Sequence, residues 1–286
     1  MMTQIYFGVD GTGPRDDGTY AKNFQDSFVN VFKQESSWDH PGYRRGPAKE
    51  GLRTKDLGDA AATHVQSRVR STLAQSSIAP FICLAGYSRG GAAVIHACNR
   101  LKEADITVDC LLLFDAVDRA VNLSGVEVVP SNVARVYHAR RHPDGASRPY
   151  FGNCGTSLAK DAGARGEGLY RQEFFRGTHG AIGGVPWQRE DAPEPVSMEP
   201  VIPHQGFALL ESAVRGLVHL HQVSAMAQGR ILESGYLSTN VTYEQDAAAA
   251  GKVGAWMRRN LTAAKMSYQM RGGAMPSPPG AGRAYA

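Results

Sequence analysis

The sequence predicts an α/β fold in which helices cover both faces of a mostly parallel β-sheet. Short, continuously apolar segments alternate along the chain with segments whose apolar residues recur at helical spacing. The apolar segments lack the alternation of a strand with one face in water, which is typical of strands buried on both faces. Strands and helices that alternate in this way form a layered domain around a parallel sheet.

The amino-terminal part of the chain supplies two predicted strands and two predicted helices. Each strand is a short apolar run, and the first ends in the turn sequence DGTG at residues 10–13. Each helix places apolar residues on one face, such as Phe24, Phe28 and Val31 in the first. In order, the elements are strand 5–9, helix 23–32, a Gly-, Pro- and Arg-rich loop over 38–51, helix 56–73 and strand 80–85.

The carboxyl-terminal part adds three predicted strands and three predicted helices on the same two patterns. In order, they are helix 91–102, strands 108–114, 133–138 and 172–176, and helices 205–227 and 246–270. Residues 142–170 and 185–203 are rich in Gly or Pro and have no clear period, which predicts loops. We expect the long loops within 33–55 and 142–205 to cover one edge of the sheet.

The composition is that of a folded protein with one domain. The chain has 286 residues, 42% hydrophobic residues and a formal net charge of +4. We expect a single domain over residues 1–275 and a loose tail, rich in Pro and Gly, over 276–286. Basic residues are scattered rather than gathered in a stripe with aromatic residues, so we expect no nucleic-acid partner. Peripheral contact with an anionic membrane surface stays open.

The cysteines and the hydrophobic segments bear on where the protein works. Three of the four cysteines fall in apolar segments and none forms a C-x-x-C pair, so we expect buried thiols: Cys83, Cys98, Cys110 and Cys154. The first residues lack the basic and long apolar regions of a signal peptide, so we expect a cytoplasmic location in the producing cell, with any export by another route. Residues 207–226 are hydrophobic but include Glu211 and Arg215, which predicts a core helix rather than a membrane span.

The segment FICLAGYSRGGAAVIHACNRL, residues 81–101, places a serine between two glycines where a strand meets a helix. In a nucleophile elbow the chain turns sharply at such a serine and holds it in a strained conformation, with Oγ above the sheet edge. Side chains at Gly86 and Gly90 would collide with that turn. The backbone N–H of Arg89 would then face the atom that Ser88 attacks. The alternative is a purely structural glycine-rich turn, as in dinucleotide sites, but the G-x-G-x-x-G spacing is missing here.

A serine nucleophile needs a base, and the base needs an orienting carboxylate. In the α/β-hydrolase arrangement these follow in the order Ser, Asp or Glu, His. Asp115 ends the strand after the nucleophile helix, and His179 lies in a glycine-flanked loop after the last predicted strand. Carboxyl ends of parallel strands share one edge of the sheet, so Ser88, Asp115 and His179 are expected to meet there. The structural alternatives are a helix N-cap for Asp115 and an ordinary loop histidine for His179.

Other residues compete for the same roles. The competing carboxylates are Asp118 and Asp144, and the competing histidines are His138, His142 and His204. A metal site formed by His138, His142 and Asp144 is a weaker alternative because no further ligand follows at suitable spacing, so we expect no metal. The second donor to an oxyanion is expected in the first strand–helix loop, from the N–H of Gly11 or Thr12, and Asp10 is expected to hold that loop by local hydrogen bonds.

Four motifs give the chain a family resemblance. They are FGVDGTG at the first strand, GYSRGGA at the elbow, FDAVD after the next strand and FFRGTHGAIGG near the last strand; VYHARRHPDGASRPYF is a looser fifth match. Together they resemble the α/β-hydrolase phospholipase effectors of bacterial type VI secretion and the wider hydrolase family around them. The resemblance implies an α/β-hydrolase-like fold, a Ser88–Asp115–His179 triad, hydrolysis of phospholipid acyl esters, a cognate immunity protein and a secretion-apparatus carrier. One departure is Ala181, which stands where the family usually has an acidic residue.

The sequence therefore predicts a serine ester hydrolase that needs no cofactor, most specifically a phospholipase or lipase. Its oxyanion site would use backbone donors at Arg89 and at Gly11 or Thr12. One alternative is a soluble carboxylesterase or thioesterase. The other is a non-catalytic binding protein on a hydrolase scaffold.

Overall fold

The fold centres on a six-stranded sheet in which every strand pairs in parallel with its neighbours. The computed structural model describes residues 2–35, 38–48, 53–117, 123–142, 153–159, 169–188, 197–200, 236–239 and 241–271. The six strands are β1 (Gln4–Val9), β2 (His40–Arg44), β3 (Phe81–Tyr87), β4 (Cys110–Phe114), β6 (Arg135–Arg141) and β8 (Leu169–Phe175). The predicted α/β class with a mostly parallel sheet is confirmed.

The direction in which strands are added to the sheet reverses between β1 and β3. Across the sheet the order is β2-β1-β3-β4-β6-β8. The chain thus leaves β1 toward one edge, returns past β1 to β3, and then continues to the other edge. Ligands of open parallel sheets bind beyond the carboxyl ends of strands where this direction reverses. The two segments at this position are the loop 10–13 after β1 and Ser88 after β3.

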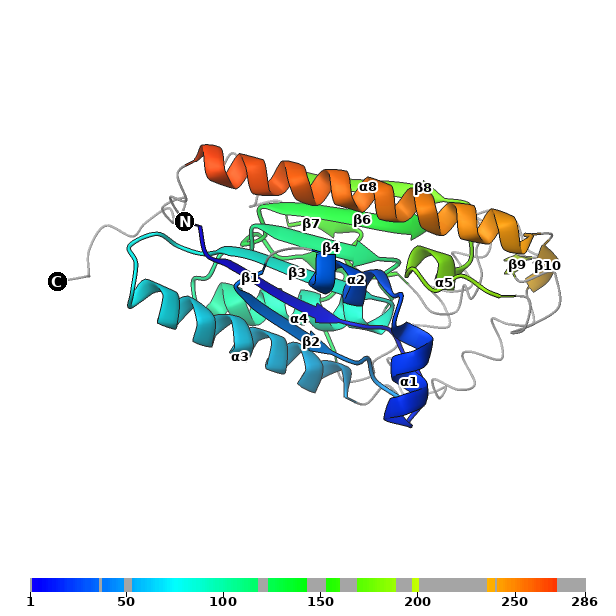
Figure 1. Ribbon diagram of the computed structural model, residues 1–286, viewed down its shortest axis with the longest axis horizontal. Coiled ribbons are helices and arrows are strands. Elements are labelled where there is room, and N and C mark those ends of the chain that lie inside the picture. Colours follow the sequence, from blue (N-terminus) through cyan, green and yellow to red (C-terminus); the bar gives the residue numbers. More distant parts are fainter. Residues whose placement is uncertain are drawn as a thin grey trace.

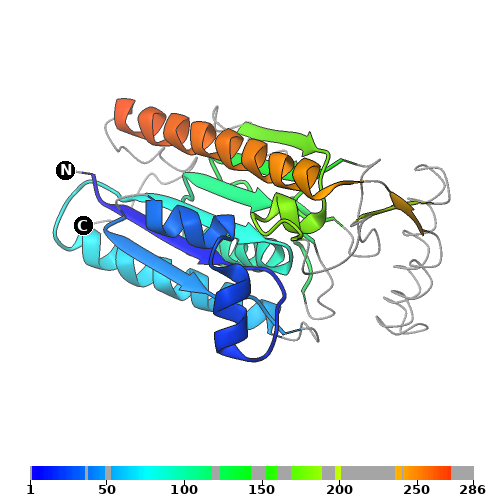
Figure 2. The same cartoon turned by 45° about the vertical axis from the view of Figure 1, so that its right-hand side comes forward.

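Two layers of helices enclose the sheet (Figure 1). The helices are α1 (Asp17–Phe24), α2 (Phe28–Glu35), α3 (Thr54–Leu73), α4 (Arg89–Glu103), α5 (His179–Ile182) and α8 (Tyr243–Met270). One hydrophobic cluster joins α3 and α4 to one face, and a second joins α1, α2, α5 and α8 to the other, as Figure 2 shows from a second angle. Along β3, Ile82 and Leu84 enter the first cluster while Phe81 and Ala85 enter the second. Both faces need apolar residues, which explains the uninterrupted apolar runs.

Two sequence predictions in the amino-terminal part are wrong in detail. The predicted helix 23–32 is divided, because α1 ends at Phe24 and α2 begins at Phe28. The loop predicted over 38–51 contains strand β2, which pairs in parallel with β1. Proline and glycine in HPGYR hid this strand, and its position at the edge of the sheet is where a strand tolerates proline. The segment 33–55 is therefore not a continuous roof over the sheet edge.

The structure also contains two small sheets that the sequence did not predict. Strands β5 (Val128–Val129) and β7 (Ser157–Leu158) pair in parallel, the second of them inside the predicted connection 142–170. Strands β9 (Ser197–Pro200) and β10 (Tyr236–Thr239) pair antiparallel, with β9 inside the predicted loop 185–203. Such short strands give too few residues for a periodic pattern.

Three further predictions concern the carboxyl-terminal segments, the cysteines and membrane-spanning helices. The predicted helix 205–227 and tail 276–286 lie outside the described residues. All four cysteines are buried thiols, as expected. Within the described ranges, no helix combines the length and the apolar character needed to cross a bilayer.

Candidate active site

Ser88 lies at a sharp, strained turn between β3 and α4. Its backbone has φ 56° and ψ −127°, a conformation that residues other than glycine rarely adopt. Three hydrogen bonds hold the turn: Ser88 N–H donates to the Phe114 carbonyl at 3.0 Å, and the Ser88 carbonyl accepts from Gly91 N–H at 2.9 Å and Val117 N–H at 3.1 Å. Such strain costs on the order of 1–3 kcal/mol and persists where its surroundings fix it. These bonds orient Ser88 at the carboxyl edge of the sheet.

Two glycines make this turn sterically possible. A Cβ on Gly86 would lie 2.5 Å from the carbonyl oxygen of Gly90. A Cβ on Gly90 would lie 2.1 Å from the carbonyl oxygen of Val9 in β1. Both clashes are with backbone, which cannot move aside as a flexible side chain could. The G-x-S-x-G spacing thus reflects close packing of the elbow on itself and on the neighbouring strand.

His179 contacts Ser88 from the segment that follows β8. It begins the short helix α5, four residues beyond the end of β8, and the residue is 4% exposed. Its Nε2 is 2.9 Å from Ser88 Oγ, and its ring centroid is 5.0 Å from that of Tyr87. Contact with the Tyr87 ring limits the orientation of the imidazole, so Nε2 is directed at Ser88.

Asp115 completes a hydrogen-bonded chain with these two residues. Asp115 Oδ2 is 2.6 Å from His179 Nδ1, and the aspartate is 1% exposed. Its backbone also has a positive φ, 44°, and its N–H donates to the Ala139 carbonyl of β6 at 2.7 Å. The chain therefore runs from Ser88 Oγ through both imidazole nitrogens to a buried carboxylate. This is the arrangement in which a histidine accepts a proton from a serine and a carboxylate fixes the tautomer.

Arg141 sets the charge of Asp115. The guanidinium of Arg141, at the end of β6, donates to Asp115 Oδ2, and Arg141 N–H lies 3.3 Å from Asp115 Oδ1. Burial alone raises the pKa of Asp115, but the charge of Arg141 and the hydrogen bond with His179 outweigh it and hold that pKa below its ordinary range. Asp115 is therefore an anion near neutral pH.

A second buried carboxylate, Asp246, holds the loop that carries His179. Asp246 is in the first turn of α8 and is fully buried. It accepts hydrogen bonds from Thr178 N–H at 2.7 Å, Thr178 Oγ1 at 2.9 Å and Trp187 N–H at 3.0 Å. Thr178 in turn caps α5, because its Oγ1 accepts from Ala181 N–H. The position of His179 thus depends on a residue near the far end of the chain.

The loop after β1 lies against the elbow and is held by Asp10. This aspartate is fully buried and accepts from Tyr43 OH at 3.0 Å and from Ser27 Oγ. It also accepts from Gly11 N–H at 3.0 Å. The expectation that Asp10 holds this loop agrees with these bonds. Because Gly11 N–H is committed to Asp10, Thr12 is the better candidate for an oxyanion donor from this loop.

Arg89 joins this loop to the elbow. Its guanidinium lies 3.2 Å from Thr12 Oγ1 and 3.4 Å from the Ala48 carbonyl. Arg89 is also the first residue of α4, and the first N–H groups of a helix have no acceptor inside it. The arginine side chain thus links the loop after β1 to the start of α4, the two segments in which the sequence predicts oxyanion donors.

The two competing histidines within the described ranges, His138 and His142, have other contacts. His138 is fully buried in β6, where Nε2 accepts from Ala116 N–H at 3.1 Å and Nδ1 lies 3.1 Å from the Gly155 carbonyl. Burial lowers its pKa to about 3, so it is a neutral structural group. The ring of His142 packs edge-on against Phe174. The remaining competitors, Asp118, Asp144 and His204, lie outside the described residues. Within the described ranges, no group of His, Cys, Asp and Glu is arranged to hold a metal ion.

The sequence-based prediction missed Arg141 and Asp246. Arg141 follows Arg140 at the end of β6, and Asp246 shares the first turn of α8 with Glu244, so neither residue stands out in the sequence. The signal for Asp246 was its place after the capping sequence Thr242-x-x-Gln245, which marks a helix start but not its partner. Their roles follow from contacts across 26 and 68 residues of chain, which no local pattern encodes.

Comparisons with known proteins give only distant likenesses. No protein-family model matches the chain, and a search of curated proteins found no match. Among solved structures, a cutinase-like protein from Cryptococcus sp. is 20% identical, with 45% of this chain and 60% of that protein aligned and a TM-score of 0.26. A proposed cell surface hydrolase from Lactobacillus plantarum WCFS1 is 9% identical, over 83% of this chain and all of the other, with a TM-score of 0.34.

A third solved structure is similarly distant from this chain. The type II thioesterase BorB from the borrelidin biosynthetic cluster is 9% identical, over 63% of this chain and 86% of the thioesterase, with a TM-score of 0.33. Likenesses this distant carry no argument about activity. The functional conclusion therefore depends on the geometry of the site.

Proposed function

We propose that the protein is a serine ester hydrolase with Ser88 as nucleophile, His179 as base and Asp115 as the orienting carboxylate. The observation that carries the proposal is the continuous chain of hydrogen bonds from Ser88 Oγ to Asp115 Oδ2 at a strained strand–helix turn. A structural serine needs neither a positive φ nor a histidine held between it and a buried anion. The geometry therefore supports catalysis over the alternative of a non-catalytic binding protein.

The reaction proceeds in two steps in this proposal. Ser88 Oγ forms a bond to the ester carbonyl carbon while its proton moves to His179 Nε2. The tetrahedral intermediate then collapses, and the alcohol leaves with the proton from Nε2, which gives an acyl-serine. A water molecule, deprotonated by the same nitrogen, attacks this acyl group and releases a carboxylic acid and free Ser88. Asp115 remains an anion throughout and stabilises the imidazolium.

The negative charge that develops on the carbonyl oxygen needs donors that are fixed in advance. We assign this role to the backbone N–H groups of Arg89 and Thr12, with support from the amino-terminal position of Arg89 in α4 and the tether from its guanidinium to Thr12. One such donor contributes roughly 3–4 kcal/mol in a comparable hydrolase. Preorganisation is the physical benefit, because the donors do not have to reorient during the reaction.

The finer part of the proposal concerns the substrate. The four motifs that resemble phospholipase effectors support acyl esters of lipids, and the mildly basic composition is compatible with contact at a membrane surface. The same resemblance supports delivery to a target cell by a secretion apparatus and neutralisation by a cognate immunity protein in the producer.

Active-site labelling and one substitution test the mechanism. A fluorophosphonate probe should attach to wild-type protein at Ser88 and not to Ser88→Ala. Ser88→Ala should lower ester hydrolysis by roughly 10⁴-fold or more while circular dichroism and the unfolding midpoint stay unchanged. Substantial hydrolysis by this variant, or labelling at another residue, would show that the nucleophile is elsewhere.

A series of substrates tests whether the protein acts on acyl esters of lipids. Wild-type protein should hydrolyse phospholipid vesicles and long-chain p-nitrophenyl esters faster than p-nitrophenyl acetate. A preference for short water-soluble esters or for acyl thioesters would instead favour a soluble carboxylesterase or thioesterase.

A further inference from the structure

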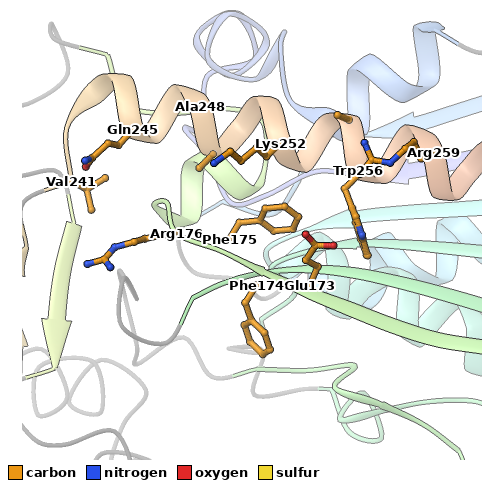
Figure 3. Close-up of a pocket in the computed structure, with 12 residues that line it drawn as sticks. Glu173, Phe174, Phe175, Arg176, Val241, Gln245, Ala248, Lys252, Trp256 and Arg259 are labelled. Atoms are coloured by element: carbon orange, nitrogen blue, oxygen red, sulfur yellow. The ribbon is translucent and has the colours of Figure 1, made fainter.

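A groove of about 610 Å³ lies between the last strand of the sheet and the longest helix, apart from the Ser88–His179–Asp115 chain (Figure 3). One wall is the end of β8, where Glu173 and Phe175 are two residues apart and so share one face of the strand. The other wall is α8, where Lys252, Trp256 and Arg259 recur at spacings of four and three residues and so share one face of the helix. The volume is in the range of small-molecule sites.

The walls of the groove combine an apolar floor with basic side chains. The rings of Phe175 and Trp256 meet edge to face, with centroids 6.1 Å apart. Figure 3 shows Trp256 reaching from α8 toward the strand, and Phe174 directed away from the groove. Three basic residues, Arg176, Lys252 and Arg259, line the groove against one acidic residue, Glu173. A ligand that fits this surface has an apolar body and a negative charge.

Small side chains on the helix wall leave space along the groove. Ala248 lines it before Lys252, and Ala255 lines it between Lys252 and Arg259, so an extended chain can lie against α8 without displacing a large side chain. One end of the groove is near Arg176, three residues before His179. The groove thus begins close to the active-site edge of the sheet and runs away from it, beside the outer strand.

We propose that this groove binds an anionic amphiphile, meaning an aliphatic chain that ends in a carboxylate or a phosphate. The aliphatic chain lies on Phe175 and Trp256, and the positive charges of Lys252 and Arg259, which lie on either side of Trp256, attract the negative group. The site goes beyond the proposed hydrolysis and does not require it, although a fatty carboxylate is also the product class that this hydrolysis would release. The carboxylate and phosphate forms share one chemistry, and separate ligands distinguish them.

Calorimetric titration of the wild-type protein tests the ligand class. Dodecanoate and dodecyl phosphate, each below its critical micelle concentration, should bind at a saturable site. Dodecyl maltoside and dodecyltrimethylammonium, which carry the same chain with a neutral or positive head, should bind at least about tenfold more weakly, a difference of about 1.4 kcal/mol. Binding of dodecyl phosphate without dodecanoate would identify the phosphate form as the ligand. Equal binding of all four amphiphiles would overturn the proposal, because chain burial alone would then explain it.

Paired charge reversals test the location. Lys252→Glu/Arg259→Glu should weaken dodecanoate binding at least about tenfold, because two attractive charges become repulsive. The control is Lys22→Glu/Arg70→Glu, which makes the same change of net charge at exposed positions on α1 and α3 and should bind as the wild type does. Equal weakening in both variants would show a non-specific charge effect and overturn the site.

Fluorescence quenching gives a second readout that does not depend on charge. A fatty carboxylate with bromine at the end of its chain should quench the fluorescence of Trp256 on contact. Trp256→Phe should remove most of this quenching, whereas Trp38→Phe, which changes a buried tryptophan near β1, should keep it. The same quenching in the two variants would place the chain elsewhere. Failure of Ser88 labelling would count against hydrolysis alone and leave these results unchanged.

Discussion

Asp10 and Asp115 are both buried at the carboxyl ends of strands that flank β3, yet their surroundings favour opposite protonation states. Asp10 follows β1, is fully buried, and its partners are the hydroxyl groups of Ser27 and Tyr43 and the N–H of Gly11. Burial raises the pKa of Asp10 to about 7, because these neutral donors offset only part of the lost hydration.

Asp115 is also almost fully buried, but its pKa is lowered rather than raised. It follows β4 and meets the guanidinium of Arg141 and the imidazole of His179. Their combined effect exceeds that of burial, so the pKa of Asp115 falls below its ordinary range. The comparison shows that burial alone does not decide the charge of a carboxyl group. A permanent anion, which can stabilise an imidazolium, requires a cation beside it, whereas a carboxyl group with hydroxyl partners is suited to holding a loop.

Removal of the Asp115 charge should have the largest effect on activity. Asp115→Asn should lower kcat for ester hydrolysis by roughly 10⁴-fold, because the amide cannot stabilise the imidazolium and favours the wrong tautomer. The comparison variant is Asp10→Asn, which should keep most of the activity. Initial rates on one p-nitrophenyl ester measure both. Comparable rates for the two variants would remove the distinction between the two carboxylates.

The cation beside Asp115 should matter most for stability. Arg141→Met should lower the free energy of unfolding at pH 7 by about 3–5 kcal/mol, because it leaves a buried carboxylate without its compensating charge. Urea titrations of this variant, of Asp115→Asn and of the double variant form a cycle. The double variant should lose less than the sum of the two single variants, since the unpaired charge is then absent. Additive losses would mean that the two residues are not coupled.

Substitution of the buried Asp246 tests a residue that positions His179 without contacting Ser88 or Asp115 in the hydrogen-bonded chain. Asp246→Asn keeps an acceptor but weakens the bonds to Thr178, so we expect kcat to fall about 10- to 100-fold through displacement of His179. Fluorophosphonate labelling of Ser88 should slow in parallel. Gln245→Asn is the matched control, because it lies in the same turn of α8 and alters the helix cap without touching Thr178. A similar loss in the control would indicate disruption of the helix start rather than of the His179 loop.

The pH dependence of the free energy of unfolding should reveal the raised pKa of Asp10. Its pKa in the folded protein is about 7, against about 3.9 when unfolded. Between these values the folded state keeps a proton that the unfolded state has lost, so this group lowers stability as the pH rises from 5 to 7. Asp10→Asn should remove a decline on the order of 1–2 kcal/mol over that interval, measured by urea unfolding at both pH values. For Asp115 the sign is opposite, with stability lost only as the pH falls below about 4.

Much of the candidate site was predictable because its signals are local. The elbow at Ser88 follows from glycine spacing between a buried strand and a helix, and the positive φ and the backbone clashes at Gly86 and Gly90 give that spacing its physical reason. Asp115 and His179 were predictable as polar residues just beyond strand ends. Edge strand β2 was not, because proline and glycine obscure its pattern and only pairing with β1 makes it a strand.

The sequence by itself determined the class of the fold, the place of the elbow and the residue types that could act there, because each depends on periodicity or on sterics over a few neighbouring residues. The tertiary structure decided which of these residues meet. It set the strand order that brings the loop after β1 beside Ser88, committed Gly11 N–H to Asp10, and placed Arg141 against Asp115 and Asp246 under Thr178. These contacts join residues far apart in the chain, so their energies depend on burial and on charges that exist only once the sheet and its helices have packed.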